Sequence, residues 1–218
     1  MQALKSFLFL LFIVVCSIKT VNASTTTIDF ESLAQDGTGY TFISGAYVDS
    51  GYTFTASNSV PYSFATAGTA DPRFAGSTAL TTFNFSFVFF ESNTGSSFDM
   101  LSIDLAPVSL GLNDPFGVDR ELGMAYQTTI YGRKVDGSII SQQLNLPNTS
   151  TSNILTTYLL QDFTGLTQVA IDSSAFPGVQ FDNIVLQTVS TVPEASRFSL
   201  IALGLLLIAY AMRKPHGR

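Results

Sequence analysis

Short runs in which apolar and polar residues alternate fill the chain from Ser24 to Gln187, separated by Gly, Asn, Asp, Ser and Pro. A period of two residues is typical of strands that bury one face, and the 3.6-residue period of an amphipathic helix is not evident here. The clearest run extends from Phe83 to Phe89, where phenylalanine occupies every second position. About nine or ten strands at this spacing predict an all-β domain over residues 24–187, a jelly-roll-like antiparallel β-sandwich.

Turn and alternation patterns place the other strands. Asp136-Gly137 is a favourable two-residue hairpin turn, so we expect two strands to meet there between Met124 and Leu146. Further runs with a period of two predict strands at 28–31, 52–55, 101–105, 166–171 and 181–186.

Aromatic side chains are predicted to build the core, because the chain has 19 Phe, 8 Tyr and no Trp. Phenylalanine at alternate strand positions fills a gap of about 10 Å between packed sheets, so we expect Phe83, Phe85 and Phe87 to be buried. The absence of Trp weakens the interpretation of a sugar-stacking platform, for which tyrosine is the alternative residue. The sequence singles out none of the candidates, which are Tyr40, Tyr47, Tyr52, Tyr62, Tyr126, Tyr131 and Tyr158.

Residues 1–23 have the parts of a cleavable secretory signal peptide. A basic residue, Lys5, precedes an uncharged stretch of about a dozen residues, and small residues follow at Val21 and Ala23. We therefore expect cleavage between Ala23 and Ser24. The alternative is a retained membrane anchor, for which the apolar stretch is short.

A second apolar segment, Phe198–Met212, lies near the C-terminus between Arg197 and Arg213. As a helix it would span about 22 Å, against roughly 30 Å of membrane hydrocarbon, and the flanking arginines can extend to the interfaces. We therefore expect a single transmembrane helix over residues 198–212, followed by a basic cytoplasmic tail over residues 213–218.

Basic residues beside both apolar segments predict the topology. Arg213, Lys214 and Arg218 follow the C-terminal segment, and Lys5 precedes the N-terminal one. Because basic flanks remain in the cytoplasm, both ends of the chain are expected there, and the β-sandwich is expected on the other side of the membrane.

The linker over residues 188–197, between the domain and the apolar segment, contains Val192-Pro193-Glu194-Ala195-Ser196. A short motif of this kind, then a hydrophobic segment, then a basic end make up the PEP-CTERM sorting signal of bacterial surface proteins. The C-terminus of this chain resembles that signal, with the three features in the same order. The family usually has a second proline where this chain has Ala195. The resemblance covers the last 27 residues of the chain, and a plain single-pass anchor is the alternative.

The resemblance implies recognition by an exosortase, a membrane enzyme that cuts near this motif, in a Gram-negative bacterium that makes exopolysaccharide. It implies an inner-membrane-anchored precursor facing the periplasm, then delivery to the cell surface or extracellular matrix. Pro193 lacks an N–H and keeps Val192 extended, which suits an accessible cleavage segment. A structural or adhesive role in an exopolysaccharide layer is the expectation that follows.

The charge of the central region excludes one class of partner. Residues 24–192 hold four basic residues against fifteen acidic ones, a net charge of −11. Nucleic acids bind to basic faces, so we expect no nucleic-acid partner. The four basic residues are Arg73, Arg120, Arg133 and Lys134.

The composition also excludes much of catalysis. Cys16 and His216 are the only cysteine and histidine, and both lie outside the central region. Catalysis that needs imidazole or thiolate is therefore excluded from the domain, and we expect no enzyme and no catalytic residues. Two alternatives stay open. The first is a carbohydrate-binding module, and the second is a β-sandwich polysaccharide hydrolase that uses a pair of carboxylates.

Acidic residues near both ends of the domain suggest one cofactor. Asp182 alternates with Ile184 and Leu186, and a carboxylate on an apolar face needs a partner or a metal. In jelly rolls the first and last strands often lie close together, so Asp29 and Glu31 are candidates to share a structural calcium ion with Asp182. The alternative is an Asp182 that is hydrogen-bonded to the backbone without metal.

Overall fold

The computed structural model describes residues 22–57, 63–82, 87–108, 126–146, 154–173, 178–190 and 204. Residues 24–188 form one compact unit, and the two ends of the chain are assigned to another. The expected sorting motif, basic tail and transmembrane helix lie outside the described residues, apart from Gly204, as does the expected signal peptide up to residue 21. Among the described residues, no helix has the length and hydropathy that a membrane crossing requires.

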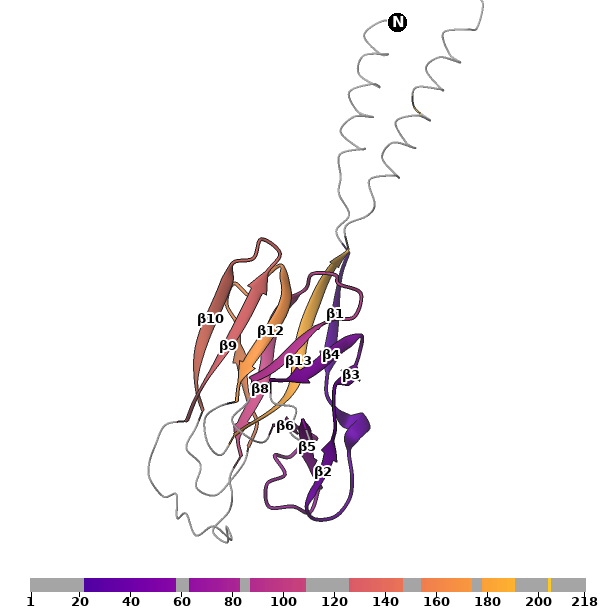
Figure 1. The fold of residues 1–218 in the computed structure, drawn as a ribbon, viewed down its shortest axis with the longest axis vertical. Helices are drawn as coiled ribbons and strands as arrows, with labels where there is room; N and C mark the ends of the chain where they lie inside the picture. Colours follow the sequence, from indigo (N-terminus) through magenta and orange to yellow (C-terminus); the bar gives the residue numbers. More distant parts are fainter. Residues whose placement is uncertain are drawn as a thin grey trace, which may run out of the picture. The chain divides into compact units, whose positions relative to one another are not determined.

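Two β-sheets with antiparallel strands enclose the core of the compact unit (Figure 1), which confirms the predicted all-β sandwich. The seven-stranded sheet has the order β11-β8-β13-β6-β5-β2, with β1 paired to β13, and the six-stranded sheet has the order β10-β9-β12-β7-β4-β3. The strands of the first are β1 (Asn22–Ile28), β2 (Tyr40–Ile43), β5 (Phe64–Ala67), β6 (Leu80–Thr81), β8 (Asp99–Pro107), β11 (Thr156–Leu159) and β13 (Val179–Ser190). Those of the second are β3 (Tyr47–Asp49), β4 (Tyr52–Ala56), β7 (Phe87–Ser92), β9 (Tyr126–Lys134), β10 (Ile139–Leu146) and β12 (Leu166–Asp172).

Aromatic rings join the two sheets in the core. Phe30 packs edge-on against Phe54 of β4, with ring centroids 5.4 Å apart, and against Phe181 of β13 at 5.7 Å. Because β4 and β13 belong to different sheets, Phe30 links the two sheets. Its contacts have the edge-to-face geometry that aromatic pairs prefer. The largest fully buried side chains are Phe30, Phe54, Phe64, Phe90, Phe98, Phe163, Phe181, Ile28, Leu80, Met100, Ile103 and Leu105.

The predicted hairpin is confirmed as β9 and β10. Its turn contains Gly137 with φ of 83°, a left-handed conformation that glycine adopts without steric cost. The Asp136 carboxylate accepts hydrogen bonds from the backbone N–H and the hydroxyl of Ser138, which closes the turn. This hairpin supplies one wall of the candidate site described below.

The phenylalanine run has a different phase from the one predicted. Val88 and Phe90 are fully buried, whereas Phe87 and Phe89 are half-buried on the opposite, outer face of β7. The prediction that Phe87 is a core residue is therefore wrong, and Phe83 and Phe85 lie outside the described residues. Residues 87–90 are all apolar, so alternation alone fits either phase, and pairing of β7 with β4 and β12 selects one.

The strand predicted at 101–105 is present within β8, but its alternation breaks. Ile103 and Leu105 are buried, while Leu101 is 39% exposed. The register between β8 and β13 shifts twice. The first shift puts an extra residue in β13 at Asn183, which has φ of 44°, and the second puts Leu101 of β8 between the partners of Val185 and Leu186. A β-bulge of this kind reverses which residues face inward, and a two-residue period does not reveal it.

Candidate functional site

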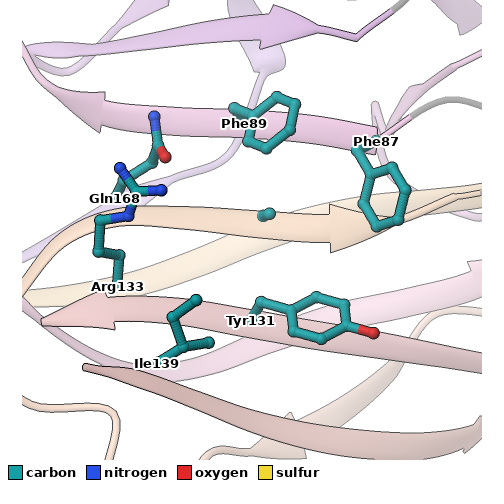
Figure 2. A pocket seen from close by; sticks show the side chains of 7 residues that line it. Phe87, Phe89, Tyr131, Arg133, Ile139 and Gln168 are labelled. Carbon is teal, nitrogen blue, oxygen red and sulfur yellow. The ribbon is translucent and has the colours of Figure 1, made fainter. Parts of the chain in front are cut away.

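A groove lies on the outer face of the six-stranded sheet (Figure 2). Ala170 of β12 belongs to its lining. Ala170 is directly opposite Phe89 of β7 on one side and Tyr131 of β9 on the other. Because an alanine stands between two aromatic residues, the surface is hollowed along β12. The hollow has a volume of about 280 Å³ and is lined by Phe87, Phe89, Tyr131, Arg133, Ile139, Gln168 and Ala170.

Aromatic rings form the walls of this groove. Phe87 and Phe89 are two residues apart on β7, so they share a face, and their rings stack at 6.2 Å with an interplanar angle of 28°. The Tyr131 ring lies 6.3 Å from that of Phe87 at an angle of 56°. The three rings belong to two strands separated by β12, and they offer a continuous apolar surface to a ligand.

Polar groups gather at one end of the groove. Arg133 lies opposite Gln168, and Gln168 lies opposite Glu91 in the next strand. The Gln168 amide Nε2 donates to Glu91 Oε2 at 3.4 Å, while the Arg133 side chain is exposed beside it (Figure 2). Guanidinium and amide groups at this end can donate and accept hydrogen bonds with a ligand that rests on the rings.

Glu31, one of the predicted calcium ligands, is tied to another segment. It begins the short 3₁₀ helix Glu31–Leu33 and its carboxylate accepts hydrogen bonds from the Ser77 hydroxyl at 2.8 Å and from the Thr78 N–H and hydroxyl. These hydrogen bonds lower the pKa of Glu31, with that from Ser77 acting most strongly. Asp29 is exposed and accepts a 3.3 Å hydrogen bond from the Glu31 N–H.

Asp182, the third predicted ligand, is fully buried in β13. Phe181 and Ile184 both belong to the core, so the bulge at Asn183 places Asp182 on the opposite face and not, as predicted, with Ile184. That face is covered by the segment before β6, whose Arg73 carbonyl accepts a hydrogen bond from Gln180. Burial, followed by the negative charges of Glu31 and Asp104, raises the pKa of Asp182 to about 6.

The structure adds two residues that the sequence interpretation missed. Asp104 of β8 is directly opposite Asp182, and the Asn183 Nδ2 donates to Asp104 Oδ2 at 2.9 Å and to Asp182 Oδ2 at 3.2 Å. Asp29 is not part of this arrangement. Among the residues that the structure describes, no three His, Cys, Asp or Glu side chains are already gathered as metal ligands.

An ion pair holds the covering segment in place. Arg73 donates to Asp71 from Nε at 2.6 Å and from a terminal nitrogen at 2.7 Å, and its guanidinium lies 4.0 Å from the centre of the Tyr40 ring. Asp71 also accepts from the Gly39 N–H at 2.7 Å. The hydrogen bonds from Arg73 hold the pKa of Asp71 well below its usual range. The Arg73 guanidinium is therefore already paired with Asp71.

Sequence reasoning reached only part of the groove. Tyr131 stands among the seven tyrosines without distinction, Phe87 is assigned to the core, and Arg133 enters only through the charge count. Gln168 and Ala170 carry no local signal at all. The four consecutive apolar residues 87–90 are the one available sign, because a strand cannot bury both faces unless both sheet surfaces are covered.

Comparisons with known proteins return structures only. No family model and no curated protein matches the chain. A variant from a study of ligand recognition by family 29 carbohydrate-binding modules is 15% identical, covering 77% of this chain and 87% of that one, with a TM-score of 0.42. A carbohydrate-binding module of family 29 is 14% identical (77% and 90% covered, TM-score 0.41), and a variant complexed with mannohexaose is 12% identical (77% and 94% covered, TM-score 0.41). The likeness of this chain to these structures is one of fold.

Proposed function

We propose that the protein is a non-catalytic polysaccharide-binding protein and that the groove over Ala170 holds the sugar chain. The observation that carries the proposal is the aromatic surface of Phe87, Phe89 and Tyr131, which are half-buried on the outer face of a sheet whose other face packs against the core. Sugar rings have apolar C–H faces and polar edges. Aromatic walls with polar groups at one end suit that combination.

The dimensions of the groove favour a short segment of a polymer. Its volume of about 280 Å³ is at the lower end of ligand sites, which run from about 300 to 1,000 Å³. The groove follows β12, so a longer chain extends along the strands beyond it. Arg133 and Gln168 then bond hydroxyl or carboxylate groups at the sugar's edge.

The chemistry of the lining supports binding in preference to cleavage. Glycoside hydrolysis uses a pair of carboxylates on either side of the scissile bond. The described residues that line the groove include no Asp or Glu. We therefore favour the carbohydrate-binding interpretation over the hydrolase, and a structural or adhesive role in an exopolysaccharide layer follows from binding its polymer.

Export and sorting belong to the same proposal and are supported by the sequence. The signal-like residues 1–23 and the PEP-like motif with its apolar segment and Arg213, Lys214 and Arg218 support delivery through an exosortase. In this proposal the C-terminal segment anchors the precursor in the inner membrane with the domain facing the periplasm. The processed protein then reaches the cell surface or matrix.

Binding is tested with the purified protein by calorimetry against mannohexaose, cellohexaose and exopolysaccharide from a producing bacterium. Tyr131→Ala is expected to weaken binding about tenfold or more, because it removes one wall of the groove. Phe42→Ala is the matched control, since Phe42 is an aromatic residue, 48% exposed, on β2 of the other sheet. Equal affinity of both variants and the unaltered protein would reject the groove as the binding site.

A further inference from the structure

The buried carboxylate of Asp182 has one oxygen whose hydrogen-bonding capacity is unused. Asp182 Oδ2 accepts from Asn183 Nδ2 at 3.2 Å, whereas Oδ1 is buried without a hydrogen-bond partner among the described residues. The side chain as a whole is 0% exposed. A buried carboxylate oxygen that lacks a partner is costly, so native proteins compensate it with a donor, a proton or a cation.

Two acidic side chains, Asp104 and Glu31, act on Asp182 from neighbouring elements. Asp104 faces it from β8, and the Asn183 amide donates to both carboxylates. Burial and the negative charge of Glu31 in the 3₁₀ helix raise the pKa of Asp182, and Ser77, whose hydroxyl donates to Glu31, lowers it. Arg73 is in the covering segment, but its guanidinium is paired with Asp71. Among the described residues, the charged groups that shift the pKa of Asp182 are therefore the acidic side chains Glu31 and Asp104.

We propose that Asp182 Oδ1 binds a hard divalent cation such as Ca²⁺, held between β13, β8 and Ser77 of the covering segment before β6. The charges of Asp104 and Glu31 attract it, and the Ser77 hydroxyl is a neutral oxygen ligand within the same cluster. Ca²⁺ takes six to eight oxygens and accepts water and neutral ligands among them. Because three carboxylates are not already gathered, neutral oxygens and water complete the shell, and the affinity belongs to the weak range of about 10⁻⁴–10⁻³ M.

The cation would connect four segments that are remote in sequence. Glu31 precedes β2, Ser77 precedes β6, and Asp104 and Asp182 lie on neighbouring strands of the seven-stranded sheet. The groove is on the six-stranded sheet, so the cation would stabilise the fold without touching the sugar. The inference therefore stands or fails independently of the proposed function.

The test measures thermal unfolding of the full-length protein in detergent at pH 7.5, after EDTA treatment and then with CaCl2 or MgCl2 up to about 10 mM. We expect Ca²⁺ to raise the midpoint by about 3 °C or more, because it binds the folded state alone. Asp182→Asn keeps the shape of the side chain and is expected to lose that response. The matched control, Asp162→Asn, changes an exposed carboxylate and retains it.

Two results would overturn the proposal: no Ca²⁺ response in the unaltered protein, or an unchanged response in Asp182→Asn. Should Asp182→Asn not fold, equilibrium dialysis with radioactive Ca²⁺ compares Ca²⁺ binding by the unaltered protein with Ca²⁺ binding by Asp104→Asn. About one saturable ion per chain, bound more weakly by Asp104→Asn, supports the site. No saturable binding, or equal binding by both, rejects it.

Discussion

Asp104 and Asp182 lie directly opposite each other on β8 and β13, and the Nδ2 group of Asn183 donates a hydrogen bond to both carboxylates. Like charges at opposed cross-strand positions are unfavourable. The pair therefore makes the stability of this end of the sandwich depend on pH, and it is the centre of the cation site that we propose. The groove over Ala170 on the other sheet is lined mainly by uncharged groups.

Stability in EDTA is expected to rise as the pH is lowered from 7.5 to 5.5. Burial raises the pKa of Asp182 from its ordinary range to about 6, so the folded protein binds this proton more tightly than the unfolded chain does. The resulting stability is complete below the unfolded pKa and is lost as the pH rises through 6, about 3 kcal/mol between the extremes. Urea unfolding at each pH measures it, and Asp182→Asn should remove most of this dependence.

Stability is expected to fall again below about pH 4. Glu31 and Asp71 have lowered pKa values because Ser77 and Arg73, respectively, bond their charged forms. A lowered pKa contributes stability above the unfolded value that is lost as the pH falls through the folded value. Urea unfolding between pH 5 and pH 2 checks this, and Asp71→Asn should show a shallower loss. A steady gain in stability down to pH 2 would contradict the prediction.

Asp71→Ala is expected to destabilise the fold by about 2–4 kcal/mol. The Asp71 side chain is almost fully buried and accepts hydrogen bonds from Arg73 and from the Gly39 N–H, so its loss leaves these donors without their acceptor. Chemical unfolding at pH 7 provides the measurement. Asp136→Ala is the control, because Asp136 caps an exposed turn. A change of similar size in both variants would argue against a special role for the ion pair.

Ala170→Leu is expected to reduce sugar binding at least tenfold while leaving the unfolding midpoint nearly unchanged. The added atoms would occupy the groove between Phe89 and Tyr131 and would point away from the core. Thr157→Leu, an exposed position on β11 of the other sheet, should bind as the unaltered protein does. Full binding by Ala170→Leu would show that the ligand lies elsewhere.

Gly132→Ala is expected to destabilise the domain by about 1–2 kcal/mol through overpacking. An added Cβ would lie 2.8 Å from Leu166 Cδ2 and 3.1 Å from Ile140 Cγ2, on the core side of the strand that carries Tyr131. These are side-chain ends that can shift, so the cost is moderate. Sugar affinity of the folded variant should be nearly unchanged, and calorimetry beside urea unfolding separates the two effects.

The intact mass of the protein from its native envelope tests export and sorting. We expect an N-terminus at Ser24 and a C-terminus near Val192, because the signal peptide and the C-terminal segment would both be removed. A mass that retains Arg218 would instead indicate a permanent anchor. Expression with and without an exosortase gene provides the control.

Local patterns in the sequence were sufficient for the sandwich class, the Asp136-Gly137 hairpin and the strands at 52–55 and 101–105. In each case the information is contained in a few adjacent residues. A turn with Gly137 needs only its own backbone freedom, and a two-residue period needs only one buried face.

Tertiary structure alone decided the two candidate sites. Phe89, Ala170 and Tyr131 come from three strands, and only the register of β7, β12 and β9 places them in one row. The bulge at Asn183 turns Asp182 away from Ile184 and toward Asp104, because one extra residue shifts every later side chain to the other face. Pairing between strands remote in sequence is a property of the folded sheet, so a single strand's pattern does not contain it.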